Sequence, residues 1–230
     1  LMTASLKILV ERYNLKGKVV GDVALGALMQ SSANWNFARE VVQASGLHPN
    51  TPAYNVQRAC GTSLETTIQI AHKISSYQIE SGIAGGVDSN SDLPIMVTRS
   101  FSQKLVALNS ARTLGEKLRI FLSFRPSDLK PVPPAVVEPR TGKSMGEHCE
   151  LMVKEWKISR QEQDELALAS HLNAAKAYKD GFYADLVFPF LGKSTDGIMR
   201  GDTTLEKLAK LKPAFDLSLI HISEPTRRYA

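Results

Sequence analysis

The chain has only two cysteines among its 230 residues, Cys60 and Cys149. Secreted domains that are built on disulfides carry many more, so a disulfide framework is not expected. The sequence also lacks an apolar run of transmembrane length, and no signal peptide is visible, although a targeting segment ahead of Leu1 would escape this test. We therefore predict a cytoplasmic protein without a membrane span.

A strong charge of one sign is missing as well. Lysine and arginine number 28 and aspartate and glutamate 23, which gives a net charge of +5. There is no Lys/Arg run and no basic stripe interleaved with aromatic residues, so nucleic-acid binding is not favoured. A ligand that carries phosphates would explain a local basic surface, and such an excess often reflects solubility alone.

The first part of the chain alternates between strand and helix patterns. Short apolar runs predict strands at residues 19–25, 52–56 and 82–87. Amphipathic patterns predict helices at 36–44 and at 61–80. The second of these helices has apolar residues at near-helical spacing, namely Leu64, Ile68, Ala71, Ile74 and Ile79. Strands that alternate with helices predict an α/β fold whose sheet is covered on both faces.

The second part of the chain is mainly helical and irregular. Residues 101–128 mix charged and apolar side chains, and we assign no element there. A helix is predicted at 145–156. Ser159 and Glu162 have the spacing of a capping box, which predicts a further helix that runs to about Lys179.

Cys60 is the residue with the clearest chemical meaning. It lies between the predicted strand at 52–56 and the helix that begins near Gly61, at a strand-to-helix turn. Free backbone N–H groups and the positive end of the helix dipole favour a thiolate at such a position, which suits a nucleophile. The alternative is a small buried hydrophobe, which is the commoner role of a lone cysteine.

The sequence offers two weaker candidates for the same site. His148 is a candidate base for Cys60, but it lies in a predicted helix, where a solvent-facing histidine is the commoner outcome. Gly85 and Gly86 lack the full glycine pattern of a phosphate-binding loop. We interpret them as allowing close packing around the nucleophile.

Five segments, taken in order along the chain, carry a family resemblance. They are NVQRACGTSLE at 55–65, GIAGGVDS at 82–89, SMGEHCE at 144–150, ISRQEQDE at 158–165 and LAKLKPAFD at 208–216. Each resembles the corresponding segment of thiolases, and together they span most of the chain. Between them, the stretch from Arg112 to Ala135 resembles the 3-ketoacyl-CoA thiolase branch that pairs with the multifunctional β-oxidation subunit.

The resemblance implies a fold and a set of site residues. The fold class is α/β, the N-terminal half of a thiolase-type layered α/β/α/β/α fold, followed by a mainly helical loop domain that binds CoA. Cys60 would attack an acyl-CoA carbonyl and become an S-acyl enzyme, and the N–H of Gly61 would lie near the acyl oxygen or else only start the helix. Met145 and Gly146 match a segment that lines the pantetheine channel, although methionine is more often core filler. Arg200 matches a position near the adenine and phosphates of CoA, where the alternative is a solvated charge.

The resemblance also implies substrates and partners. Free CoA would cleave a 3-ketoacyl-CoA of fatty acid β-oxidation into acetyl-CoA and a shortened acyl-CoA. CoA and acyl-CoA are substrates, and neither a cofactor nor a metal is implied. The intact protein would be a homo-oligomer, with the multifunctional β-oxidation α subunit as a candidate partner. Lys207 stands where some thiolases have a serine, which puts details of the pocket in doubt.

The ends of the chain depart from the thiolase pattern. A first strand and helix are expected ahead of Leu1. Residues 1–92 match the N-terminal core half and residues 93–216 the loop domain, whereas residues 217–230 resemble a translated sequencing adapter and are interpreted as an artefactual tail. The Gly-His-Pro and Cys-x-Gly motifs of the family's second catalytic half are absent from the sequence. The chain alone is therefore expected to be inactive.

Other functions stay open at this point. A biosynthetic acetyl-CoA acetyltransferase, or another condensing enzyme such as a ketoacyl synthase relative, would share the fold and the nucleophilic cysteine. A Cys-His hydrolase or transferase is a wider class with the same nucleophile. A non-enzymatic interaction protein is the third alternative, and tight multimerisation without any effect of CoA on thermal stability would favour it.

Overall fold

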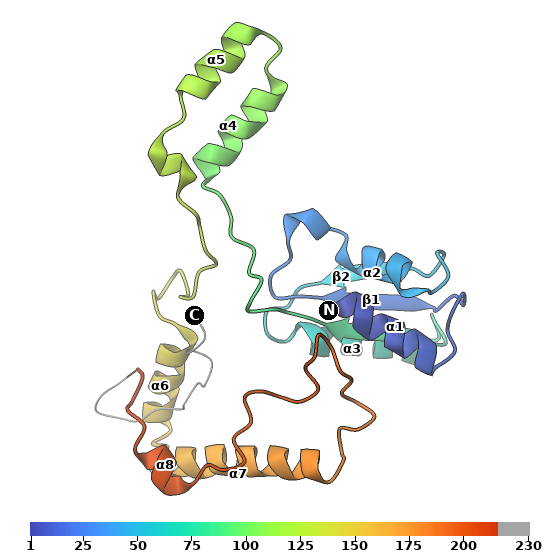
Figure 1. The fold of residues 1–230 in the computed structure, drawn as a ribbon, viewed down its shortest axis with the longest axis vertical. Helices are drawn as coiled ribbons and strands as arrows, with labels where there is room; N and C mark the ends of the chain where they lie inside the picture. The colour runs from blue at the N-terminus through green and yellow to red at the C-terminus, as the bar shows by residue number, and fades with distance from the viewer. Residues whose placement is uncertain (216–230) are drawn as a thin grey trace. The chain divides into compact units, whose positions relative to one another are not determined.

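The computed structural model describes residues 1–215, so the predicted artefactual tail lies outside the described residues. The chain divides into two compact units, Leu1–Pro134 and Ala135–Ala230 (Figure 1). The predicted boundary at residues 92 and 93 differs from this division and stays a prediction about family domains. Each unit is described by itself below.

A parallel sheet forms the centre of the first unit. Strand β1 (Asp22–Gly26) lies between β2 (Ala53–Val56) and β3 (Gly82–Gly86), and all pairings are parallel (Figure 1). Every residue of β1 is buried. Because parallel strands require crossover connections, each link between them includes a helix, and the predicted α/β class is confirmed.

Helices cover both faces of this sheet. Helices α1 (Met2–Arg12) and α2 (Phe37–Ser45) pack with Val23 and Leu25 of β1 in one apolar cluster. The intervening Ala24 points to the other face, as the period of two requires, and packs with Ile70 of α3 (Thr62–Ser75). A short 3-10 turn, η1 (Ser32–Asn34), precedes α2. The sheet is therefore the middle layer of a three-layer unit.

Helix α3 corrects one sequence prediction and shows which of its faces is buried. It ends at Ser75 rather than near residue 80, because Tyr77 adopts a left-handed backbone with φ of 59° that a helix cannot continue. The residues that α3 buries are Thr62, Thr66 and Ile70, whereas the predicted apolar positions Leu64 and Ile68 are 65% and 40% exposed. The apolar stripe therefore faces away from the sheet.

Glycine lets α3 approach the sheet closely. A Cβ added at Gly26 would lie 2.1 Å from the carbonyl oxygen of Val56 and 2.4 Å from Cγ2 of Thr62. A Cβ at Gly82 would lie 2.7 Å from Cγ2 of Ile70. None of these three atoms can move away easily, because the oxygen of Val56 is strand backbone and the two methyl carbons lie on the buried face of α3. The glycines thus fix the distance between α3 and the strand ends.

We expect Gly26→Ala to lower the stability of the chain by about 1–3 kcal/mol, the usual cost of overpacking, or several degrees in Tm. Gly115→Ala is the matched control, because a Cβ at Gly115 would meet nothing within 4 Å. Thermal unfolding followed by circular dichroism measures both variants. Equal midpoints for the two variants would contradict the close approach of α3.

A helical hairpin follows the sheet along the chain. Helix α4 (Arg99–Ser110) and helix α5 (Leu114–Leu122) lead to a 3-10 turn, η2 (Pro126–Leu129) (Figure 1). Neither helix has a buried residue, although apolar residues recur at helical spacing in α5, at Leu114, Leu118 and Phe121. The chain enters and leaves the hairpin side by side, with Met96 and Val132 paired through two backbone hydrogen bonds.

The second unit is helical, as predicted. Helix α6 (Met145–Glu155) begins at a capping box formed by Ser144 and Glu147. Helix α7 (Arg160–Lys179) begins at the predicted capping box of Ser159 and Glu162. Helix α8 (Leu205–Ala209) is tied to α7 by the Arg160 guanidinium, which donates 2.6 Å hydrogen bonds to Asp164 and to the carbonyl of Leu208. No helix within residues 1–215 is long and apolar enough to span a membrane.

Candidate active site

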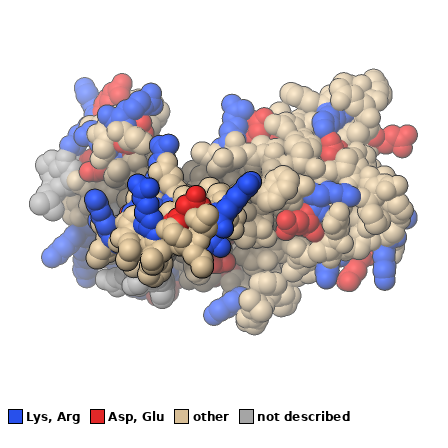
Figure 2. All heavy atoms as spheres, turned by 90° about the horizontal axis from the view of Figure 1, so that it is seen from above, with Lys and Arg blue, Asp and Glu red and all other residues tan. Residues whose placement is uncertain are grey.

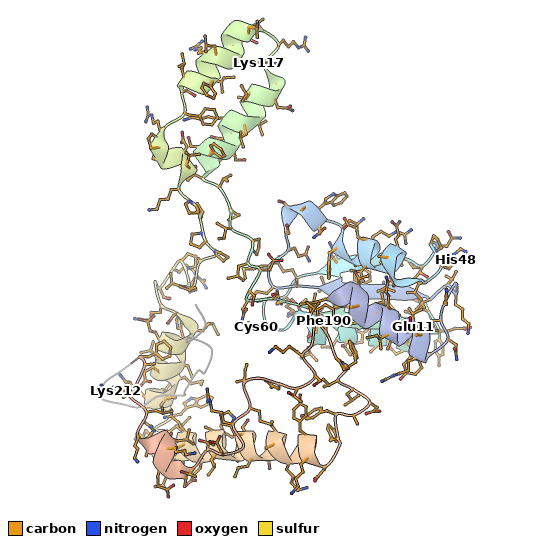
Figure 3. The ribbon with its side chains drawn as sticks, viewed as in Figure 1. Glu11, His48, Cys60, Lys117, Phe190 and Lys212 are labelled. Atoms are coloured by element: carbon orange, nitrogen blue, oxygen red, sulfur yellow. The ribbon has the colours of Figure 1, made fainter. Side chains whose placement is uncertain are left out.

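Cys60 lies at the carboxyl edge of the parallel sheet. Strand β2 ends at Val56, and α3 begins at Thr62 with Gly61 as its N-cap residue, so the cysteine occupies the connecting turn. Figure 3 places Cys60 at the end of the sheet opposite His48, which precedes β2. The thiol is exposed. This is the edge at which open α/β sheets bind ligands, and an exposed thiol there argues against the buried-hydrophobe alternative.

The turn that carries Cys60 is held in an unusual backbone conformation. Ala59 has a φ of 44°, in the left-handed region that residues with a Cβ seldom adopt. The hydroxyl of Thr62 stabilises the turn, because it accepts a 2.8 Å bond from the N–H of Arg58 and donates a 2.8 Å bond to the carbonyl of Ala59. Strain of this kind persists where the surroundings enforce it, which is common at functional sites.

Gly61 makes a helix-start contact. Its N–H donates a 3.0 Å hydrogen bond to the carbonyl of Arg58. This bond accounts for the helix-start role, and the contact with an acyl oxygen stays a prediction. A contact with an acyl oxygen would need this bond to open.

An ion pair covers the first turns of α3. The Arg58 guanidinium lies 2.7 Å from the Glu65 carboxylate. The pKa of Glu65 is lowered, chiefly by a hydrogen bond from the Gln69 amide and secondarily by Arg58. Glu65 therefore remains charged near the helix N-terminus, where a negative charge is favourable.

The side chains of Asn55 and Asp88 tie the strand ends near Cys60 to neighbouring segments. Asn55 at the end of β2 accepts a 2.8 Å bond from the N–H of Ala38, in the first turn of α2, and donates a 2.7 Å bond to the carbonyl of Trp35. Asp88, just after β3, accepts a 3.0 Å bond from the N–H of Leu28, just after β1. Sequence reasoning missed both roles. Their signal was the position of a polar residue at the end of a predicted strand.

The second unit holds the predicted pantetheine residues. Met145, at the start of α6, is 77% exposed. Gly146 lies directly under the ring of Phe215, since a Cβ added there would be 1.9 Å from the ring. Both residues line a cavity of about 220 Å³ whose other walls are Cys149, Glu150, Val153, Gln163 and Phe215. Two acceptor oxygens in this cavity, one each on Glu150 and Gln163, are buried without a hydrogen-bond partner among the described residues.

Arg200 lies on a loop that packs against α7. Its backbone N–H donates a 3.3 Å bond to Nδ1 of His171, and its side chain is exposed. Lys207, which stands where some thiolases have a serine, pairs with Asp202 at 3.1 Å. Lys207 lowers the pKa of Asp202, and Arg200 adds a smaller effect. The Arg200 guanidinium is thus available at the surface.

His148 also lies in the second unit. Its Nε2 is 3.0 Å from the hydroxyl of Thr141, a local contact across the start of α6. Cys60 belongs to the first unit, whereas His148, Met145, Gly146 and Arg200 belong to the second. The roles predicted for these residues stay predictions.

Comparison with known proteins decides the family. The model of the thiolase N-terminal domain matches residues 1–218. The chain belongs to the thiolase family. It is 42% identical over 214 residues to a 3-ketoacyl-CoA thiolase of Photobacterium profundum, which covers 90% of the chain and 49% of the relative. It is also 42% identical over 214 residues to a 3-ketoacyl-CoA thiolase of Vibrio cholerae.

A solved structure supports the same fold. The acetyl-CoA acetyltransferase of Bacillus anthracis superposes with a TM-score of 0.72 at 28% identity, covering 93% of this chain and 52% of that one. This thiolase chain therefore spans about half the length of the relatives it matches. The fold class predicted from the sequence, an N-terminal thiolase half, is confirmed.

Proposed function

We propose that this chain carries the nucleophile of a 3-ketoacyl-CoA thiolase of fatty acid β-oxidation. The observation that supports it most is the exposed Cys60 in a strained turn at the carboxyl edge of a parallel sheet, in a chain 42% identical to proteins of that name. The proposed substrates are a 3-ketoacyl-CoA and free CoA. The cytoplasmic location, the homo-oligomer and the β-oxidation α subunit stay predictions.

The proposed reaction has two steps. The Cys60 sulfur attacks the C3 carbon of the 3-ketoacyl-CoA, the C2–C3 bond breaks, and the electron pair left on C2 takes up a proton to give acetyl-CoA. The acyl group remains on Cys60 as a thioester. The thiol of free CoA then loses its proton and attacks this thioester, which releases the shortened acyl-CoA and restores Cys60.

The turn geometry favours the first step. The thiol is exposed in the turn that leads directly into α3, so an acyl-CoA carbonyl can reach the sulfur. The hydrogen bonds of Thr62 hold the backbone of the turn, so the position from which Cys60 projects is fixed before the attack. The bonds of Asn55 and Asp88 fix the two neighbouring loops in the same way.

A protection experiment tests the nucleophile and its substrate class in a full-length version, made by joining this chain to the remaining half of a relative. We expect iodoacetamide to label Cys60, and acetyl-CoA to slow that labelling by transferring its acetyl group to the thiol. Acyl carrier protein loaded with an acetyl group should give no protection. Protection by the carrier protein but not by acetyl-CoA would favour a condensing enzyme instead.

The second proposed function is a biosynthetic acetyl-CoA acetyltransferase, favoured by the likeness to the protein from Bacillus anthracis. The two proposed functions differ in the length of the acyl chain that Cys60 accepts. A full-length version, in which this chain is joined to the remaining half of the Photobacterium profundum relative, allows the comparison. Thiolysis of acetoacetyl-CoA alone, with no turnover of longer 3-ketoacyl-CoA substrates, would favour the acetyltransferase.

Arg200 is proposed to bind a phosphate of CoA through its exposed guanidinium. A contact that is made equally in the ground state and the transition state affects KM rather than kcat. In the full-length version we expect Arg200→Ala to raise KM for CoA about 3- to 10-fold with little change in kcat, and the difference should shrink at high salt. Arg112→Ala, which removes an equal charge from the other unit, serves as control. A KM for CoA that does not change would remove Arg200 from the site.

A further inference from the structure

The loop after β1 lies between the two strand ends that flank it in the sheet. At the carboxyl edge, Gly26 of β1 pairs with Val56 of β2 on one side and with Gly86 of β3 on the other. Leu28 follows two positions after Gly26. Its backbone N–H and its carbonyl each bond to a side chain from one of these neighbouring strand ends. Leu28 is therefore the residue at which three strand ends are joined, and one of them leads to Cys60.

Asp88 holds the N–H side of Leu28. Its two carboxylate oxygens each lie 3.0 Å from the Leu28 nitrogen, and Oδ1 also accepts a 3.4 Å bond from the N–H of Met29. Asp88 forms no ion pair within residues 1–215. Acidic side chains also form no large patch on the face that Figure 2 shows. The carboxylate of Asp88 therefore acts through its hydrogen bonds to backbone, and bonds to a charged acceptor are among the stronger ones.

Gln57 holds the carbonyl side of the same residue. Its Nε2 donates a 2.7 Å hydrogen bond to the carbonyl oxygen of Leu28. Gln57 is the first residue after β2 and lies three positions before Cys60. The bond joins residues that are 29 positions apart in the sequence. It therefore ties the start of the Cys60 turn to the loop after β1.

The turn at residues 57–62 is thus held at two places. The Thr62 hydroxyl bonds to the N–H of Arg58 and to the carbonyl of Ala59, whereas Gln57 anchors the first residue of the turn. The left-handed backbone of Ala59 costs free energy unless its surroundings enforce it. Loss of the first anchor lets this backbone relax, and Cys60, as the next residue, moves with it.

A displaced sulfur affects the proposed reaction more than it affects simple thiol chemistry. Attack on the carbonyl of a bound acyl-CoA needs the sulfur at one place, and a misplacement of about 1 Å can cost about 100-fold in rate. A small reagent from solvent reaches the exposed thiol of Cys60 from many directions. A change in position therefore slows acyl transfer and leaves alkylation as it was.

We propose that Gln57 and Asp88 are positioning residues for Cys60, joined through the backbone of Leu28. Gln57 fixes the start of the turn, and Asp88 fixes the residue to which Gln57 is bonded. Neither side chain touches the substrate. The inference rests on the function proposed above, because the sulfur that the two residues position is the nucleophile of that reaction.

Kinetics of the full-length version test the role of Gln57. Gln57→Met removes the donor and keeps the length of the side chain. We expect kcat to fall about tenfold, while the dissociation constant of CoA, measured by calorimetry, stays within about twofold. The rate of alkylation of Cys60 by iodoacetamide should stay within about twofold at every pH, because the thiolate fraction does not change. Gln78→Met is the matched control, since the Gln78 side chain makes no hydrogen bond within residues 1–215.

The same measurements test whether Asp88 acts by the same route. Asp88→Ala should lower kcat about as much as Gln57→Met, and Asp88→Asn, which keeps a carbonyl acceptor, should recover part of the loss. Because both residues act through Leu28, the double variant should lose no more than about twice what the slower single variant loses. Asp92→Ala is the control, since it removes a neighbouring acid whose carboxylate makes no hydrogen bond within the described chain.

Amide hydrogen exchange of the full-length version tests the joint without the reaction. Asp88→Ala should speed the exchange of amides at residues 57–62 relative to Asp92→Ala, although Asp88 hydrogen-bonds to none of these residues in the described part of the chain. This readout does not depend on thiolysis. Faster exchange in a full-length version that cleaves no 3-ketoacyl-CoA would contradict the proposed function and support the joint.

Three results would overturn the positioning role. They are an unchanged kcat in Gln57→Met, losses that multiply in the double variant, and equal exchange in Asp88→Ala and Asp92→Ala. Circular dichroism checks that each variant is folded. If Gln57→Met does not fold, Gln57→Glu replaces it, because a glutamate keeps the shape and polarity of the side chain but has no N–H donor.

Discussion

Replacing Cys60 with alanine should abolish thiolysis. In the full-length version we expect kcat to fall by about 10⁴-fold or more, because removal of a nucleophile eliminates the covalent route. The affinity for CoA should change little, since no contact predicted for CoA lies in the turn that carries Cys60. Steady-state kinetics with a 3-ketoacyl-CoA measures both effects, and the unchanged enzyme should give the parallel lines of a ping-pong mechanism.

Cys149→Ala is the control for this experiment. Cys149 is the other cysteine of the chain and lines the small cavity on α6, so it experiences the same reagents without a place in the proposed chemistry. Mass spectrometry after incubation with acetyl-CoA should find one acetyl group on Cys149→Ala and none on Cys60→Ala. Normal turnover by Cys60→Ala would end the assignment of this residue as the nucleophile.

The second large effect concerns the chain by itself. We expect residues 1–216 to catalyse thiolysis at a rate several orders of magnitude below that of the full-length version, because a nucleophile and its base act as a unit. No histidine within the described residues hydrogen-bonds to Cys60, and His148 is engaged with Thr141. The sequence also lacks the Gly-His-Pro motif.

Copies of the chain by itself should also associate with one another. Leu64, Ile68 and Ile74 expose one apolar stripe along α3, and exposed patches of this kind favour aggregation. Size-exclusion chromatography of residues 1–216, with and without the tail, measures this directly, and a thiolysis assay of the same fractions measures the rate. Soluble, monodisperse protein with the turnover of the full-length version would refute the prediction.

Local signals account for the elements that the sequence predicted well. The capping box of Ser159 and Glu162 lies within a single turn, so its geometry does not depend on distant residues. Strands β2 and β3 are short apolar runs bounded by proline and glycine, and both were found within one or two residues. Strand β1 begins at Asp22 rather than residue 19, because Val19 lies outside the core and is 57% exposed.

Features that depend on distant contacts escaped prediction. Helices α4 and α5 are a different case, because apolar residues recur there at helical spacing and the capping box of Thr113 and Glu116 was a second local signal that could have been used. Asn55 bonds to Ala38 across 17 residues, and Asp88 to Leu28 across 60. A single sequence does not reveal such pairs. The position of Cys60 in a turn was predictable, but the left-handed backbone of Ala59 was not.

The exposed stripe of α3 has a thermodynamic meaning because the same helix carries Cys60 at its N-terminus. A helix of 14 residues is a stiff rod about 21 Å long. Suppose that a protein surface covers Leu64 and Ile68 and binds the ordered helix more tightly than a frayed one. By mass action, that surface then stabilises the turn of Ala59. By linkage, an acyl group on Cys60 that prefers the ordered turn must raise the affinity of that surface for α3 by the same factor by which the surface favours the acyl group. Occupancy of the thiol and coverage of the stripe are therefore two readouts of one equilibrium.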